Sequence, residues 1–153
     1  VIRLLGRRLT LALGERALVQ VQCPLAVSDH SEPEPDLAVL APAADGYASG
    51  HPETALLVIE VAESSLATDR DIKADLYAEA AVPEYWIVDL SRGLAEARVA
   101  VFAEPGPDGY ARVTYHGRDE TLCPRAFPDI AVALAEFLPA PGQPDHPDHP
   151  GHR

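Results

Sequence analysis

Residues 56–90 read "LLVIEVAESSLATDRDIKADLYAEAAVPEYWIVDL" and predict a strand, a helix and a second strand. The apolar run at 56–62, interrupted only by Glu60, is typical of a buried strand. A helix of about three turns follows and is expected to end near Ala80, just before a Val-Pro pair. Residues 84–90 form the next apolar run. This order predicts a sheet with a helix packed on one face.

Patterns outside this unit predict the rest of the fold. Helices are expected at 1–14 and 129–138, where apolar residues recur at helical spacing. Strands are expected at 17–23, 24–27, 36–41, 94–102 and 111–116, with loops at 28–35, 42–53 and 104–110. Thr68 followed by Asp71 fits a capping box at the start of the central helix. The fold class is therefore α/β (α+β), a mixed sheet flanked by helices.

The composition indicates one folded domain. The chain has 153 residues, of which 47% are apolar, enough for a core of its own. The domain is expected at 1–138, followed by a disordered tail at 139–153 that is rich in Pro, Asp and His. No apolar run approaches the length of a membrane span, and charged residues interrupt the first stretch, which argues against a signal peptide. A cytoplasmic protein without membrane contact is expected.

The charge balance limits the classes of partner. Asp and Glu number 24 against 12 Lys and Arg, a formal net charge of −12. Such a chain is unlike proteins that coat nucleic acid electrostatically. The balance still allows an enzyme that meets DNA through a local patch or a bound cation.

Several residues have simple structural interpretations. Cys23 and Cys123 lack a C-x-x-C partner and are expected to be reduced, small core residues rather than zinc ligands. Trp86 lies in an apolar strand and is expected to pack in the core. Histidines 146, 149 and 152 are expected to belong to a solvated tail. The only basic cluster, "RLLGRR" at 3–8, is best explained as one face of a core-packing helix.

Glu60 raises the main functional question, because it is a carboxylate inside an apolar strand. Side chains alternate across a strand, so Glu60 shares a face with Val58 and Ala62. A buried carboxylate is costly unless a cation or donors compensate it. Asp36, at the start of a neighbouring strand, is the natural partner, and Mg²⁺ or Mn²⁺ would relieve the repulsion between the two. Alternatively, Glu60 is the last buried position of its strand and Asp36 is a turn residue.

The central helix supplies a third group. Ile72, Leu76 and Ala80 are expected to form its apolar stripe, with Lys73 and Tyr77 beside that stripe. From this margin the Lys73 ammonium can reach toward the buried glutamate, where it can orient water or neutralise a phosphoryl charge. Alternatively, Lys73 forms an exposed ion pair with the aspartate four residues before it, worth a few tenths of a kcal/mol.

Two stretches, "EPEPDLAVL" at 32–40 and the residues at 56–90, together resemble the Uma-two family of restriction-type endonucleases, within the PD-(D/E)XK nuclease superfamily. The resemblance covers about residues 1–138. The matching motifs are Pro35-Asp36, Glu60-Val61 with Ser64 and Ser65, Asp69 to Lys73 with Tyr77, and Glu84-Tyr85-Trp86 to Asp89.

The resemblance implies a restriction-endonuclease-like fold and a metal-dependent phosphodiesterase site. Asp36 and Glu60 would hold Mg²⁺ or Mn²⁺, with the backbone carbonyl of Val61 as a further ligand. The superfamily's E-x-K lysine position is occupied by Ala62, and the resemblance assigns the role to Lys73 on the helix. Asp69 and Tyr77 would be supporting residues, one positioning Lys73 and the other capping or pairing.

The resemblance also has implications for the whole chain. Family members begin with a helix and a segment similar to Tyr-Glu-Leu-Ile-Asp-Gly-Glu, and Val1 falls after its expected place. The substrate would be nucleic acid, with DNA expected, and the protein would form a homodimer or higher homo-oligomer. The alternative function is a catalytically inactive nuclease-fold protein that serves as an oligomeric interaction module.

Overall fold

A computed structural model describes residues 1–64 and 67–138, without the side chains of 67–69. The expected tail at 139–153, its histidines and Ser65 lie outside these residues. The helices are α1 (Ile2–Leu13) and α2 (Ala67–Glu79), with short 3-10 turns at Gly14–Arg16, Leu94–Glu96 and Leu134–Glu136. The strands are β1 (Leu18–Val21), β2 (Leu37–Leu40), β3 (Leu57–Ala62), β4 (Glu84–Asp89), β5 (Arg98–Gly106), β6 (Gly109–Gly117), β7 (Thr121–Leu122) and β8 (Val132–Ala133). Neither of the two described helices combines the length and apolar character needed to cross a membrane.

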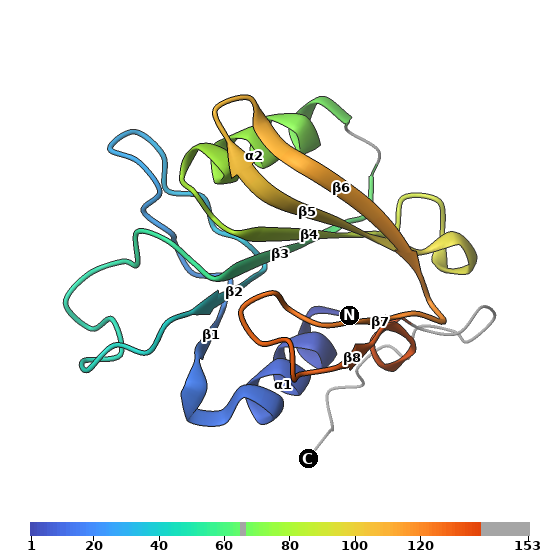
Figure 1. Ribbon diagram of the computed structural model, residues 1–153, viewed down its shortest axis with the longest axis horizontal. Helices are drawn as coiled ribbons and strands as arrows, with labels where there is room; N and C mark the ends of the chain where they lie inside the picture. Colours follow the sequence, from blue (N-terminus) through green and yellow to red (C-terminus); the bar gives the residue numbers. More distant parts are fainter. Residues whose placement is uncertain (65–66, 139–153) are drawn as a thin grey trace, which may run out of the picture.

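Six strands form one mixed sheet in the order β1-β2-β3-β4-β5-β6. Neighbouring strands are antiparallel except β3 and β4, which are parallel. Parallel neighbours need a crossover connection, and α2 supplies it. The expected mixed sheet flanked by helices is therefore confirmed. Figure 1 shows α1 and α2 on opposite sides of this sheet.

The face of the sheet that carries α1 is the larger apolar core. Its buried side chains come from α1, from alternate positions of the central strands and from the segment after β6. Leu5, Leu9 and Leu13 of α1 pack against Leu57, Ile59 and Trp86 among others. Figure 1 shows β7 and β8 on this side as well, next to α1. The core role expected for Trp86 is confirmed.

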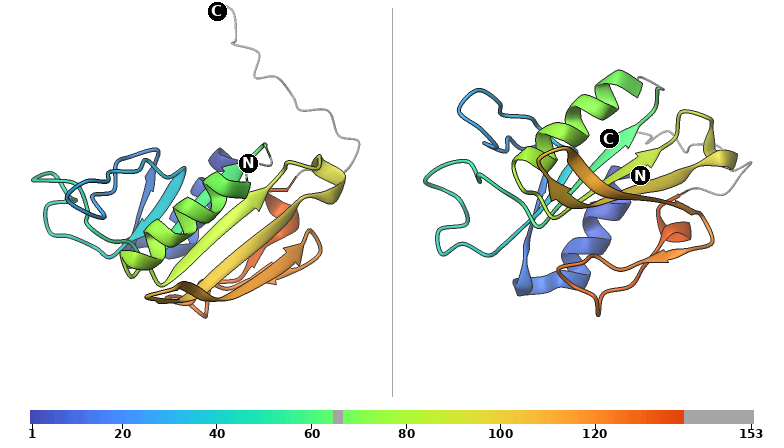
Figure 2. Two further views of the ribbon diagram at one scale, coloured as in Figure 1. Left: turned by 90° about the horizontal axis from the view of Figure 1, so that it is seen from above. Right: turned by 45° about the horizontal axis from the view of Figure 1, so that its top comes forward.

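The opposite face packs against α2, which lies over the sheet and runs roughly along its central strands in both views of Figure 2. The helix presents Ala74, Tyr77 and Ala78 to the sheet, whereas Ile72 is 62% exposed. The expected apolar stripe was therefore wrong at Ile72, although Ala80 packs against this core: the helix is rotated so that Tyr77 lies in the core instead of beside it. Packing against β3 and β4 selects this face, because the aromatic ring of Tyr77 buries more apolar surface than Ile72 would.

The end of α2 is set by its backbone. Ala81 has a φ of 57°, and the amides of Ala81 and Val82 donate to the carbonyls of Ala78 and Tyr77. This is the Schellman arrangement, which satisfies the last helical carbonyls. The chain is thereby turned back into β4. The helix begins at Ala67, so Thr68 lies inside its first turn and is not the expected N-cap.

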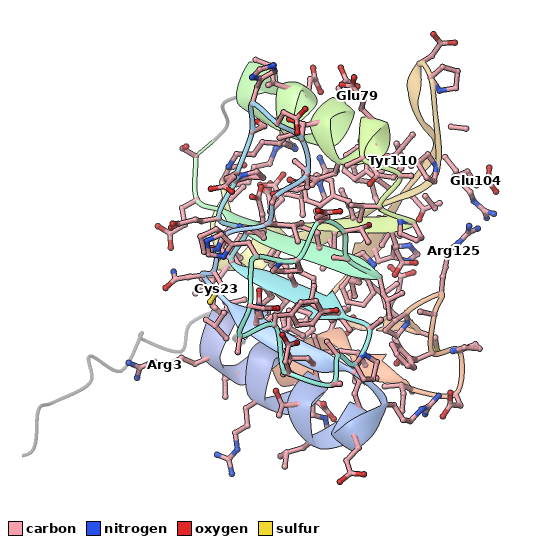
Figure 3. The ribbon with its side chains drawn as sticks, turned by 90° about the vertical axis from the view of Figure 1, so that its left-hand side faces the viewer. Arg3, Cys23, Glu79, Glu104, Tyr110 and Arg125 are labelled. Atoms are coloured by element: carbon pink, nitrogen blue, oxygen red, sulfur yellow. The ribbon has the colours of Figure 1, made fainter. Side chains whose placement is uncertain are left out.

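Three further expectations were wrong. Residues 24–27 form no strand, because Leu25 and Ala26 donate to the carbonyls of Pro33 and Pro52 in neighbouring loops. Residues 129–138 form β8 and a 3-10 turn instead of a helix; β8 pairs with β7, and this pairing replaces helical hydrogen bonds. The cysteines are free but not core residues: Cys123 is exposed and Cys23 half-buried, and Figure 3 shows Cys23 at the edge of the molecule.

Candidate active site

Asp36 and Glu60 lie on the same face of the sheet. The antiparallel register pairs Leu37 with Ile59, so one residue further Asp36 stands opposite Glu60. Directly opposite residues point to the same side, with Cβ atoms about 5 Å apart. That side carries α2. The Asp36 carboxylate also accepts a hydrogen bond of 2.8 Å from the Val61 amide. This bond fixes the carboxylate beside β3, at the start of β2.

Glu60 is a buried carboxylate whose oxygens are both hydrogen-bonded. Tyr85 donates to Oε2 at 2.7 Å and Tyr77 donates to Oε1 at 3.3 Å. The Lys73 ammonium lies 3.4 Å from Oε2. A buried carboxylate is tolerated when donors and a positive charge replace water. The fold supplies both, so Glu60 is not merely the last buried position of its strand.

The two tyrosines are fixed as donors. Burial raises the pKa of both Tyr77 and Tyr85, and the negative charge of Glu60 raises each pKa further. Their hydroxyls therefore keep their protons throughout the neutral pH range. The rings also pack on each other, with centroids 4.9 Å apart. This pair holds the Glu60 carboxylate in one orientation.

A cavity of about 270 Å³ opens beside these groups. Its lining comprises Glu34, Asp36, Glu60, Val61, Ala62, Glu63, Ser64, Arg70, Lys73, Tyr85 and Ile87. Four of these side chains are carboxylates and two are cations. The excess of negative charge suits a site that attracts a metal cation. Ala62, where the superfamily's lysine would stand, lies in the same wall as Lys73, which approaches from α2.

A second ion pair borders the cavity. Arg70 donates to Oδ2 of Asp89 at 3.4 and 3.5 Å, while the hydroxyl and amide of Ser91 donate to Oδ1 at 2.6 and 3.0 Å. Burial favours the protonated form of Asp89, but the Ser91 hydrogen bonds and the Arg70 charge outweigh it and hold its pKa below the usual range. Asp89 is therefore an ionised carboxylate buried at the end of β4.

The donor set fits a magnesium-type cation better than a softer metal. Among the described side chains, those of residues 1–64 and 70–138, no three His, Cys, Asp or Glu group closely enough to enclose an ion. Mg²⁺ does not require this, because it keeps several waters and is held by one or two carboxylates together with substrate phosphates. Asp36, Glu60 and the carbonyl of Val61 are oxygen donors of that kind.

The structure brings most of the expected site residues together. One cavity is lined by Asp36, Glu60, Val61 and Lys73. The Tyr77 hydroxyl donates a hydrogen bond to Glu60 from α2. The side chain of Asp69 lies outside the described residues. Tyr85 was missed by the sequence reasoning, although strand alternation places it on the α2 face with Val58, its neighbour in the register. Arg70 and the role of Asp89 were also missed, and no local pattern pairs them.

A family model described as "Uma2: Putative restriction endonuclease" matches residues 1–135 of the chain. No curated protein matches it. The six-stranded mixed sheet with its flanking helices agrees with the restriction-endonuclease-like fold expected from the resemblance.

Proposed function

Because the chain belongs to the Uma2 family, whose model is described as "Putative restriction endonuclease", we propose that it hydrolyses phosphodiester bonds of nucleic acid in the cavity beside Glu60, with a divalent cation. The observation that carries this proposal is the convergence of Asp36, directly before β2, with Glu60 of β3 and Lys73 of α2 on one cavity. Core packing alone does not require three titratable side chains at one place.

The proposed cation is Mg²⁺ or Mn²⁺, held by Asp36, Glu60 and the Val61 carbonyl. When bound, it would polarise the scissile phosphate and lower the pKa of a bound water. Hydrogen bonds from the Val61 amide and from Tyr85 already orient the two carboxylates. Such supporting contacts fix ligand geometry and strengthen metal binding.

Lys73 is the proposed electrostatic group of the reaction. Its side chain is 40% exposed and its ammonium lies 3.4 Å from Glu60 Oε2, so it is close to both the proposed ligand and the open cavity. An ammonium in that place stabilises negative charge that develops on the phosphate. Lys73 thus takes the role that the superfamily gives to the residue at the position of Ala62.

The direct test is cleavage of DNA by the purified protein with Mg²⁺, with Mn²⁺, and with a chelator. We expect cleavage only with a cation. Glu60→Gln, Asp36→Asn and Lys73→Gln are each expected to lower the rate roughly 100-fold or more. Glu53→Gln is the matched control, because Glu53 is an exposed carboxylate outside the cavity lining.

Two outcomes would contradict the proposal. Equal cleavage by the wild type and Glu60→Gln would place the activity in another site or in a contaminant. No cleavage of any nucleic acid, with a folded protein and both cations, would favour the alternative function, an inactive nuclease-fold interaction module.

The finer expectations belong to the same proposal. We propose DNA as the substrate, a homodimer or higher homo-oligomer as the assembly, and the cytoplasm as the location. Parallel reactions with duplex DNA, single-stranded DNA and RNA test the first expectation, and light scattering coupled to size-exclusion chromatography tests the second.

A further inference from the structure

Arg70 and Lys73 are the two cations among the described residues that line the cavity. The proposed mechanism uses Lys73 and not Arg70. Arg70 stands on the first turns of α2, and its side chain is 25% exposed. Among the described residues, its ion-pair partner is Asp89, at the end of β4. The question is whether this pair only ties the helix to the strand or presents the guanidinium to the cavity.

Two of the described arginine ion pairs show short structural contacts, whereas the exposed pair of Arg125 and Glu104, at 3.6 Å, is loose and lies outside the cavity. Arg16 grips both oxygens of Asp129 at 2.7 and 2.9 Å, and Arg8 grips both oxygens of Glu136 at 2.9 and 2.7 Å. These are short, two-pronged contacts typical of arginine with a carboxylate. Arg8 thus connects α1 to Glu136, and Arg16 connects the turn after α1 to Asp129.

The Arg70 contact differs in each respect. Both nitrogens reach a single oxygen of Asp89, at 3.4 and 3.5 Å, and the other oxygen is held by Ser91 at 2.6 Å. A guanidinium has five N–H donors in one plane, so this one-sided contact orients the group while using only part of its capacity. The loose contact and the place in the cavity wall indicate a group held ready for a second anion.

We propose that Arg70 binds a phosphate oxygen of the nucleic-acid backbone in the active-site cavity, and that Asp89 and Ser91 are positioning residues that aim its guanidinium. This inference rests on the proposed function of the cavity and deepens it by assigning a substrate contact. The planar fork of arginine suits phosphate recognition.

The charge of the cavity favours a contact of this kind. The cavity lining carries four carboxylates, and Glu34 and Glu63 are exposed. A phosphodiester approaching a protein of net charge −12 meets repulsion at that opening. Lys73 is engaged at Glu60. Arg70 therefore supplies the attraction that draws the backbone past Glu34 and Glu63, next to the proposed cation.

The test measures binding separately from cleavage. A labelled duplex DNA oligonucleotide is titrated with the wild type, Arg70→Gln and Arg70→Lys in Ca²⁺ at several salt concentrations, and cleavage is then measured in Mg²⁺. We expect Arg70→Gln to weaken binding and raise KM roughly tenfold, with a smaller change in kcat. The slope of log affinity against log salt should fall by about 0.9, the loss of one phosphate contact. Arg70→Lys should restore the salt slope but only part of the affinity.

Arg112→Gln is the matched control, since Arg112 is an exposed arginine on β6 outside the cavity; it should leave the affinity and KM close to wild type. Asp89→Asn should raise KM less than Arg70→Gln, and the double variant should resemble Arg70→Gln alone.

The outcomes separate the two proposals. Unchanged affinity and salt slope in a folded Arg70→Gln would overturn the Arg70 assignment and leave the proposed nuclease intact if the wild type still cleaves. Binding without cleavage by the wild type would refute the nuclease proposal, while the Arg70 comparison would still decide this one. Absence of both binding and cleavage would refute both.

Discussion

The two faces of β3 differ sharply in chemistry although they belong to the same six residues. On the α1 side, Leu57 and Ile59 are buried among leucines and Trp86, with no polar partner in that row. On the α2 side, Glu60 is also buried, although less completely, and it is bonded to two tyrosines and approached by a lysine. One face stabilises the domain by removing apolar surface from water, and the other carries charges that need every one of their partners.

The difference teaches where tolerance to change should lie. A dry core resists changes in volume, whereas a buried polar network resists the loss of a partner. Substitutions on the α1 face are therefore expected to affect mainly stability, and substitutions on the α2 face mainly activity.

The largest effect on stability is expected at Ile59. Ile59→Ala removes buried methyl groups from the α1 face and should lower the free energy of unfolding by about 2–5 kcal/mol, measured by urea denaturation. Glu60→Gln, one residue away, keeps the side-chain volume and an acceptor for Tyr85, so its stability loss should be smaller while cleavage is lost. A larger stability loss in Glu60→Gln than in Ile59→Ala would mean that the two faces do not divide these roles.

An intermediate effect is expected at the tyrosines. Tyr85→Phe removes the 2.7 Å hydrogen bond to Glu60 and leaves one buried carboxylate oxygen with fewer donors, at a cost of roughly 2 kcal/mol. Tyr77→Phe removes the longer 3.3 Å contact and should cost less than half as much. Cation affinity, measured by calorimetry, should fall roughly tenfold in Tyr85→Phe. Equal effects of the two variants would contradict the ranking by distance.

The smallest effect is expected at Glu84, the charged exception on the α1 face. It is buried and accepts a 2.9 Å hydrogen bond from the Trp86 indole. Burial raises its pKa, so its contribution to stability is fully present below the unfolded pKa of about 4.3 and is lost as pH rises through the raised folded value. The variant Glu84→Gln has no titrating group at this position, so this loss of stability with rising pH is absent.

Glu84→Gln should therefore raise the Tm slightly at pH 7, and its stability should fall less steeply than that of the wild type as the pH rises from 4. The two proteins should converge toward pH 4. The measurement is the Tm of both proteins as a function of pH. Profiles that run parallel would show that burial does not penalise the charged form of Glu84.

Contacts outside the two cores follow simpler rules. Figure 3 shows Glu104 of β5 and Arg125 of the segment after β7 turned toward one another, and their charged atoms lie 3.6 Å apart. Both side chains are about half exposed, so solvent screens this pair and it contributes little to stability.

Sequence patterns predicted the central unit well. The apolar runs at 56–62 and 84–90 became β3 and β4, and the helix between them was expected with an error of two residues at its start and one at its end. Strand alternation also placed Glu60 on the face that α2 covers. The prediction of a final helix at 129–138 was wrong, because apolar spacing cannot reveal that β7 is close enough to pair with β8.

By itself, the sequence determined the central strand–helix–strand unit, the buried position of Glu60 and the acidic net charge, because these depend only on neighbours along the chain. The tertiary structure alone decided which side of α2 meets the sheet, and so placed Tyr77 under Glu60 and Ile72 in solvent. It also decided that Tyr85, Arg70 and Asp89 join the site, because their contacts connect α2, β3 and β4. Such partners are chosen by the packing of whole elements against one another, and local spacing carries no record of that choice.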